Sequence, residues 1–230
     1  KALPIIRKKF FKEEILIKSF QIAGHPESHV EEMARPILAG LNREYVEPTI
    51  LASSSVIDLI FQVRGRHGGA TVNKISRAIG KTFGSNLLGE DGETIEGKVG
   101  RLLKASGLTL AVAESCTGGM IADRLTNIAG SSAYFIQGIV AYADQSKIEL
   151  LGVSPDALAR HGAVSREVAR QMAEGMLQIS GADYALSVTG ICGPAKGPSQ
   201  KPVGLVYFSL AKKGKILTLE KLFSGDRSRL

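Results

Sequence analysis

Two side chains that could act as nucleophiles, Ser115 and Cys116, stand next to each other in the stretch Glu114-Ser-Cys-Thr-Gly-Gly119. An apolar run over residues 108–113 precedes this stretch and predicts a buried strand, and a helical pattern follows from Met120. A turn between a strand and a helix aims free backbone N–H groups and the positive end of the helix at one point. The alternative is an ordinary strand–helix connection whose small residues only allow tight packing, and residue types alone do not separate the two interpretations.

A serine needs a base to become nucleophilic, and Lys147 is the candidate. No Gly-x-Ser-x-Gly motif and no obvious histidine triad motif accompanies Ser115. Asp144 is expected as the N-cap of a helix after the strand over residues 133–142. Lys147 lies near the start of this helix, where partial desolvation and the helix end would lower the pKa of the ammonium. Tyr142, at the end of the strand, could relay a proton. The alternative is that each residue is structural, with Lys147 exposed and Tyr142 at the edge of the core.

Backbone donors for a developing oxyanion are predicted at two turns. The first turn offers the N–H groups of Thr117, Gly118 and Gly119, and the second offers Gly190, which follows an apolar strand over residues 182–189. Because the carboxyl ends of parallel strands meet at one edge of a sheet, the three strand ends at Ser115, Tyr142 and Gly190 are expected to form one site.

Composition is ordinary for a soluble globular protein, with 44% apolar and 22% charged residues. No apolar run reaches the length of a membrane-spanning helix, and the first twelve residues do not resemble a signal peptide, so we expect a cytoplasmic protein without membrane contact. The two cysteines fit a reducing compartment. His25 and His29 could bind a metal, but solvated or capping histidines are favoured, and no metal site is predicted. The net charge of +7 is interpreted as a solvated basic face rather than a nucleic-acid site, since aromatic residues are not interleaved with it.

The chain divides into two predicted domains, residues 1–89 and 90–230, at the polar break that begins with Gly89. Strands and helices in the first domain follow the order βαββα, a small α+β unit. Its Gly65-Arg-His-Gly68 matches the bare GxxG loop of KH domains, but the loop follows a strand, so a basic connection is favoured over RNA contact. Alternating strands and helices in the second domain predict a three-layer αβα architecture, with a mixed, mostly parallel sheet and a late antiparallel hairpin over residues 203–223.

Seven motifs, in order along the second domain, closely resemble the CinA-type (competence/damage-inducible) family. They are Ala113-Glu-Ser-Cys-Thr-Gly-Gly119, Ala129-Gly-Ser-Ser132, Tyr142-x4-Lys147, His161-Gly-Ala-Val-Ser165, Gly190-x2-Gly-Pro194, Lys201-Pro-Val-Gly204 and Phe223-Ser-Gly-Asp-Arg227. The resemblance runs from about Glu90 to the end of the chain. The first domain resembles the KH-like middle domain of longer CinA proteins, in which a molybdopterin-binding-like domain with nucleotide pyrophosphatase activity comes first. By this resemblance, the sequence is expected to lack that domain and also a last helix after Arg227.

The resemblance implies that the protein is an amidohydrolase, a nicotinamide mononucleotide deamidase. Its products would be nicotinate mononucleotide and ammonia, in pyridine nucleotide recycling. The family's serine–lysine dyad falls on Ser115 and Lys147, its tyrosine on Tyr142 and its arginine on Arg227. Arg227 and the turn after Ser115 are expected to hold the 5′-phosphate. The resemblance further implies a homodimer and no required cofactor. The alternative is a non-catalytic nucleotide-binding or interaction module linked to competence or the DNA damage response.

Two positions depart from the family pattern. The common Tyr-Ser-Asn-Glu-Ala-Lys reads Tyr142-Ala-Asp-Gln-Ser-Lys147, which puts the carboxylate of Asp144 near the lysine and would favour its charged form. The common Gly-Ile-Ala-Gly-Pro reads Gly190-Ile-Cys-Gly-Pro194, and Cys192 is expected to be a small buried substitute for alanine.

Overall fold

A computed structural model describes residues 15–52, 56–65, 68–194 and 201–223. The chain forms two compact units, residues 1–98 and 99–230, and each is described by itself. The division falls inside helix α4 (Ile95–Ser106), nine residues after the boundary predicted at residue 89. Among the described residues, no helix is long and apolar enough to cross a membrane.

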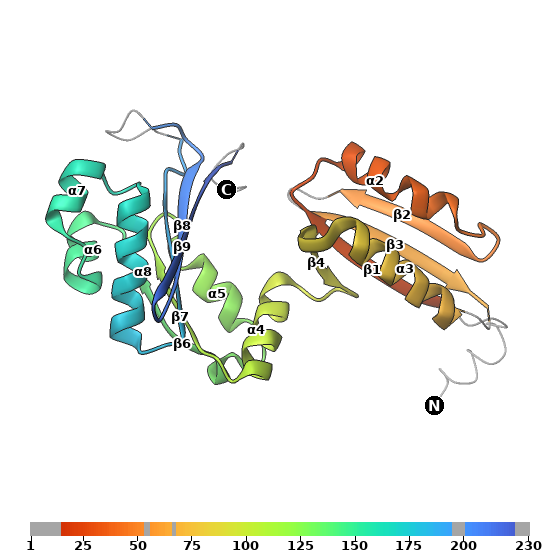
Figure 1. Ribbon diagram of the computed structural model, residues 1–230, viewed down its shortest axis with the longest axis horizontal. Coiled ribbons are helices and arrows are strands. Elements are labelled where there is room, and N and C mark those ends of the chain that lie inside the picture. Colours follow the sequence, from red (N-terminus) through yellow and green to blue (C-terminus); the bar gives the residue numbers. More distant parts are fainter. Residues whose placement is uncertain (1–14, 53–55, 66–67, 195–200, 224–230) are drawn as a thin grey trace. The chain divides into compact units, whose positions relative to one another are not determined.

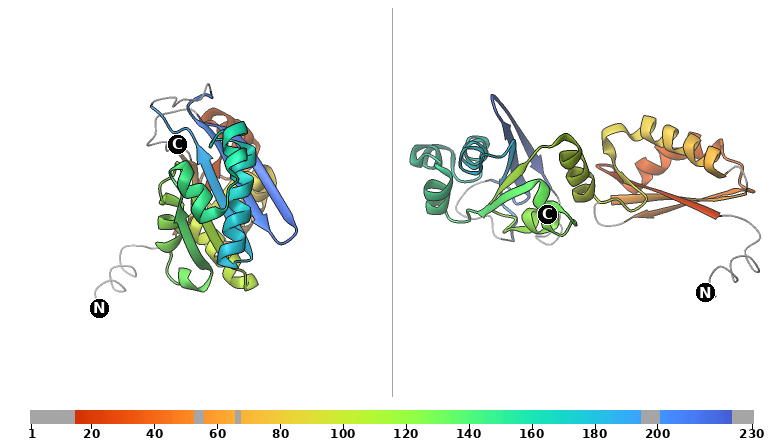
Figure 2. Two further views of the ribbon diagram at one scale, coloured as in Figure 1. Left: turned by 90° about the vertical axis from the view of Figure 1, so that its left-hand side faces the viewer. Right: turned by 90° about the horizontal axis from the view of Figure 1, so that it is seen from below.

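The first unit is an antiparallel sheet with two helices packed on one face (Figures 1 and 2). The predicted order βαββα is confirmed, with one strand more. The elements are β1 (Ile15–Ala23), α2 (Glu27–Ala39), β2 (Val46–Ala52), β3 (Val56–Arg64), α3 (Gly68–Phe83), the short helix η1 (Gly84–Asn86) and β4 (Leu87–Glu90), with the strands in the order β2-β3-β1-β4. Alternate residues of β1 and β3, such as Phe20 and Phe61, form the core with Ile75 and Ile79 of α3.

The added strand, β4, covers part of the stretch that composition predicts as a polar break. Its short, Gly-containing sequence lacks the alternation that marks a strand. Strand β4 forms because it pairs with β1. Lys18 of β1 stabilises the turn after β4 through ion pairs with Glu90 at 2.5 Å and Asp91 at 2.7 Å. Residues as far as Glu90 therefore belong to the first sheet.

The second unit has the predicted three-layer αβα architecture around a mixed sheet (Figure 1). After α4 come β5 (Leu110–Glu114), α5 (Met120–Thr126), η2 (Ser131–Ala133), β6 (Phe135–Val140), α6 (Asp144–Leu151), α7 (Pro155–His161), α8 (Arg166–Ser180), β7 (Tyr184–Gly190), β8 (Leu205–Lys212) and β9 (Lys215–Leu222). The strand order is β6-β5-β7-β8-β9. β5 runs parallel to β6 and β7, and β8 and β9 form the predicted antiparallel hairpin.

The side-chain alternation of β5 separates the two cores of this unit. Leu110 and Val112 face α4 and α5, whereas the small Ala111 and Ala113 face the side of α6, α7 and α8. Small residues also line β7 and β8 beneath α8, so the helix backbone comes close enough for Ser187 Oγ to donate to the Ala169 carbonyl at 2.5 Å. The same alternation turns Glu114, the last residue of β5, towards α5.

Candidate active site

The three predicted strand ends meet at one edge of the second sheet. Glu114 pairs in parallel with Val140 of β6 and Val188 of β7. The Ala141 N–H donates to the Glu114 carbonyl at 2.8 Å, and the Ser115 N–H donates to the Val188 carbonyl at 3.0 Å. Ser115 therefore follows β5 between the ends of its two neighbours, β6 and β7, as the sequence predicts, and its side chain is buried.

The carboxylate of Glu114 caps helix α5. It is 1% exposed and accepts the backbone N–H groups of Gly119 at 3.0 Å, Ile121 at 3.1 Å and Ala122 at 2.8 Å. A negative side chain at a helix N-terminus satisfies donors that have no partner within the helix. The role of Glu114 is absent from the sequence prediction, although an acidic residue just before a helix is a signal for it.

This cap changes the expected roles of the two glycines. The Gly118 N–H donates to the Ser115 carbonyl at 3.1 Å and the Gly119 N–H is held by Glu114, so in this conformation neither amide is available to an oxyanion or a phosphate. Both glycines have positive φ, 62° and 101°, which is the physical reason for glycine here.

The side-chain oxygen of Thr117 has no such partner. Within the described part of the chain, Thr117 Oγ1 is a buried oxygen that makes no hydrogen bond. Native proteins rarely leave such a group unpaired, so a water molecule or a ligand is expected to complete its hydrogen bonding. In the predicted donor turn, Thr117 is thus a residue whose hydroxyl group is available to a ligand.

Lys147 is a buried lysine in α6, just after the adjacent strand end. It is 1% exposed, and its Nζ donates to the Tyr142 carbonyl oxygen at 2.9 Å and lies 3.6 Å from Asp144 Oδ1. Burial lowers the pKa of Lys147 below its ordinary value, although Asp144, Cys116 and Tyr142 each act to raise it. No hydrogen bond joins Lys147 Nζ to Ser115 Oγ in the described structure.

Tyr142 and Asp144 differ from their expected local roles. The side chain of Tyr142 is 60% exposed, and it is the carbonyl oxygen that contacts Lys147. Asp144 is the first residue of α6 rather than its N-cap, a position that Ala143 takes without a side-chain bond. A carboxylate in the first turn still favours the helix, and here it also faces the buried ammonium.

The third strand end, that of β7, is fixed in place by close packing at Gly190 and by hydrogen bonds of Thr189 and Cys192. A Cβ on Gly190 would lie 2.8 Å from a methyl group of Val206 and 2.9 Å from the Leu205 carbonyl, so β8 approaches too closely for any larger residue. Thr189 Oγ1 donates to the Ala163 carbonyl at 2.9 Å. Cys192 is buried as expected, with its sulfur 4.0 Å from the Cys116 carbonyl oxygen.

Arg227, the predicted phosphate ligand, lies outside the described residues. The strand before it, β9, is described, and Leu222 at its end is opposite Leu205 at the start of β8. β9 is therefore parallel to β7 and ends at the same edge of the sheet as Ser115 and Gly190.

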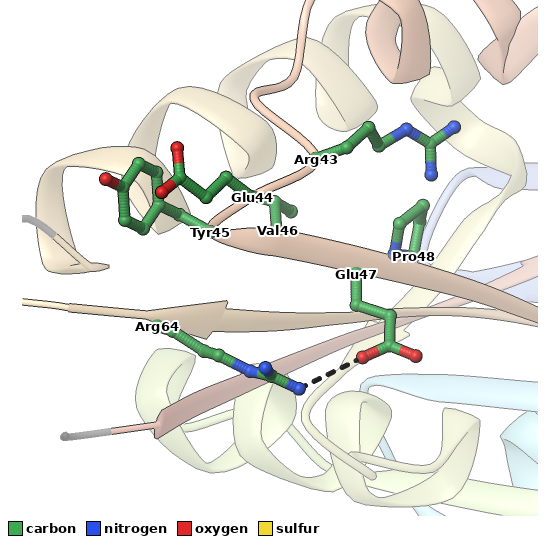
Figure 3. Close-up of a pocket in the computed structure, with 7 residues that line it drawn as sticks. All are labelled: Arg43, Glu44, Tyr45, Val46, Glu47, Pro48 and Arg64. Carbon is green, nitrogen blue, oxygen red and sulfur yellow. Dashed lines mark hydrogen bonds and ion pairs between the residues drawn. The ribbon is translucent and has the colours of Figure 1, made fainter. Parts of the chain in front are cut away.

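A hollow of about 250 Å³ in the first unit does not contain any predicted site residue (Figure 3). It is lined by Arg43, Glu44, Tyr45, Val46, Glu47, Pro48 and Arg64. Arg64 and Glu47 form an ion pair there at 3.3 Å, and because both side chains are exposed, it adds little to the free energy of folding. We therefore place the candidate site at Ser115. Among the described residues, no group of three or more His, Cys, Asp or Glu side chains could hold a metal ion.

Comparison with known proteins identifies the family. The model of the CinA C-terminal domain matches residues 92–230. A CinA-like protein of Endomicrobium trichonymphae is 42% identical over 238 residues, covering 96% of this chain and 56% of that protein. The chain spans about half the length of the curated relatives it matches.

Solved structures show the same fold over the C-terminal portion. Competence damage-inducible protein A of Klebsiella pneumoniae is 38% identical with a TM-score of 0.57, covering 58% of this chain and 83% of that chain. A competence/damage inducible protein of Agrobacterium tumefaciens is 43% identical with a TM-score of 0.56, covering 58% and 82%. These matches and the family model show that the chain belongs to the CinA family of competence/damage-inducible proteins.

Proposed function

We propose that the protein hydrolyses the carboxamide of nicotinamide mononucleotide, releasing nicotinate mononucleotide and ammonia. The observation that carries the proposal is the buried Lys147, whose pKa is lowered at the strand end beside Ser115. A neutral amine next to a serine is what a serine–lysine dyad requires, because a protonated lysine cannot accept the serine proton.

The proposed reaction has two halves. Neutral Lys147 takes the proton of Ser115 Oγ while the oxygen attacks the amide carbon, and the carbonyl electrons move onto the oxygen. The tetrahedral intermediate collapses with transfer of a proton to the leaving nitrogen, so ammonia leaves and an acyl-serine ester remains. Water, deprotonated by the same lysine, then attacks the ester and restores Ser115. The sum is one amide plus one water giving one carboxylic acid plus one ammonia.

The oxyanion needs donors other than the glycine amides of the first turn, since these have internal acceptors. We assign this role to the Thr117 hydroxyl, which is buried without a partner among the described residues, and keep the N–H of Gly190 as the second candidate. Arg227 remains the proposed ligand of the 5′-phosphate. The chemistry requires no cofactor.

Ammonia release from nicotinamide mononucleotide tests the function. We expect Ser115→Ala to lower kcat/KM by at least about 100-fold, as removal of a covalent nucleophile does. Lys147→Arg should be nearly inactive because arginine stays protonated. A wild-type protein that binds the nucleotide without releasing ammonia would instead support the non-catalytic binding module, and an active Ser115→Ala variant would exclude the acyl-enzyme.

A homodimer is part of the same proposal. The strand at one edge of the second sheet, β6, leaves Ile136 and Val140 about half exposed, and a second copy could cover them. Light scattering measures this directly, and a monomer at assay concentrations would refute it.

A further inference from the structure

The two cysteines of the chain meet beside the candidate site. Cys116 directly follows Ser115, and Cys192 lies in the turn after β7, 76 residues later. The sulfur of Cys192 is 4.0 Å from the carbonyl oxygen of Cys116, and both residues are thiols rather than members of a disulfide. The fold therefore places the side chain of one cysteine against the backbone of the other.

The backbone on both sides of this contact is held in place. Ser115 is tied to β7 by the hydrogen bond from its N–H to the Val188 carbonyl. On the other side, the Ile191 N–H donates to the Leu205 carbonyl at 2.9 Å and the Gly204 N–H donates to the Ile191 carbonyl at 2.7 Å. The register pairs Glu114 with Val188, so Cys192 lies two residues beyond the position level with Cys116, and its side chain spans this offset to contact the Cys116 backbone. A disulfide joins sulfur atoms about 2 Å apart, so forming one requires the Cys116 sulfur to approach the Cys192 sulfur at this contact.

The surroundings favour reaction at Cys116 first. Cys116 is half-buried and can be reached by a small molecule, whereas Cys192 is 9% exposed. The thiolate is the reactive form of cysteine, and access to it decides which of two thiols reacts first.

We propose that Cys116 and Cys192 are an oxidation-sensitive pair, a modification site for a small peroxide such as hydrogen peroxide. The Cys116 thiolate attacks one peroxide oxygen, the O–O bond breaks, and hydroxide leaves to take up a proton as water. The product is a sulfenic acid on Cys116. The Cys192 thiol then attacks that sulfur, the S–S bond forms, and a second water leaves. Two thiols and one peroxide give one disulfide and two waters, so sulfur is oxidised and the peroxide is reduced.

The disulfide would tether the turn that carries Ser115. Residues 115–119 connect β5 to α5 and include two glycines with positive φ. The new bond would pull Cys116, in this connection, towards the end of β7. Ser115 would shift relative to Lys147, which sits on the opposite neighbour, β6–α6. We therefore expect the oxidised protein to be inactive, an expectation that rests on the proposed deamidase function.

Mass spectrometry of the intact 230-residue chain treated with hydrogen peroxide tests the pair. We expect the mass to fall by about 2 Da, the two hydrogens lost in a disulfide, and dithiothreitol to restore it. Peptide mapping should join Cys116 to Cys192. The matched control, Cys192→Ala, should show no loss of 2 Da. A wild-type protein that instead gains about 16 or 32 Da on Cys116, or that forms a covalent dimer, would overturn the proposal.

Activity gives a second, separate readout. Peroxide should abolish ammonia release by the wild type, dithiothreitol should restore it, and Cys192→Ala should keep most of its activity under the same treatment. Equal inhibition of both proteins would refute the disulfide as the cause. If the untreated wild type releases no ammonia, the proposed function fails, and the mass measurement still decides whether the pair exists.

Discussion

The carboxylate of Asp144 acts to raise the pKa of Lys147 against the effect of burial, so its removal should increase activity at low pH. Asp144 Oδ1 lies 3.6 Å from Lys147 Nζ, but its own side chain is 62% exposed. A pair of unit charges at that distance interacts by about 1 kcal/mol in a water-like dielectric, and the exposure of Asp144 justifies that screened value. An energy of about 1 kcal/mol corresponds to about a fivefold change in the ratio of neutral to charged lysine.

The direction follows from the proposed role of Lys147 as the base that activates Ser115. In that mechanism only the neutral amine can take the serine proton, so kcat/KM should rise with pH as the ammonium loses its proton. Asp144→Asn keeps the size of the side chain and removes the charge that stabilises the ammonium. We expect kcat/KM on the acidic limb to increase about fivefold and the whole profile to move to lower pH.

The assay is the pH profile of ammonia release for the wild type, Asp144→Asn and a control. Asp156→Asn is the matched control, because it also removes an exposed carboxylate from an ion pair within one helix, here the i,i+4 pair with Arg160 on α7. The control should leave the profile unchanged. A profile of Asp144→Asn that stays in place or moves to higher pH would refute the assignment of Lys147 as the base that limits the acidic limb.

Three further predictions concern stability. Lys147→Met should abolish activity yet raise the melting temperature at neutral pH. The pKa of Lys147 in the folded protein lies below the ordinary 10.5, so between these two values the unfolded chain binds more protons and wild-type stability should rise with pH. Thermal unfolding measured at several pH values should show this rise for the wild type and not for the variant. Glu114→Gln should lower the free energy of unfolding in urea by about 1–3 kcal/mol, since an amide cannot accept all three helix N–H groups, and an unchanged value would refute the capping role. Gly175→Ala should cost at least about 2 kcal/mol in the same assay, because its Cβ would lie 1.8 Å from the Leu151 carbonyl, whereas Gly80→Ala, with open space around it in α3, should stabilise by about 0.5–1 kcal/mol.

Much of the fold can be predicted from local patterns. The apolar run before Glu114, the alternation in β3 and the repeated small-residue turns indicate the correct element types, because these signals lie within a few residues of each other. Strand β4 escapes such prediction, since its pairing partner β1 is about 70 residues away. The sequence also predicts which strand ends come together, because parallel strands share a carboxyl edge.

The sequence by itself determined the residue types of the site, with a serine, a lysine and a tyrosine at successive strand ends, and the motifs that mark the CinA family. Only the tertiary structure decided what each group is free to do. In the folded protein the N–H groups of Gly118 and Gly119 donate to Ser115 and Glu114, and Cys192 contacts Cys116. Lys147 is buried and contacts the carbonyl oxygen of Tyr142, whose ring is exposed. Hydrogen-bond donors and buried charges are assigned by whichever partner lies closest in space, and that proximity arises when the strands pair and the helices pack on them.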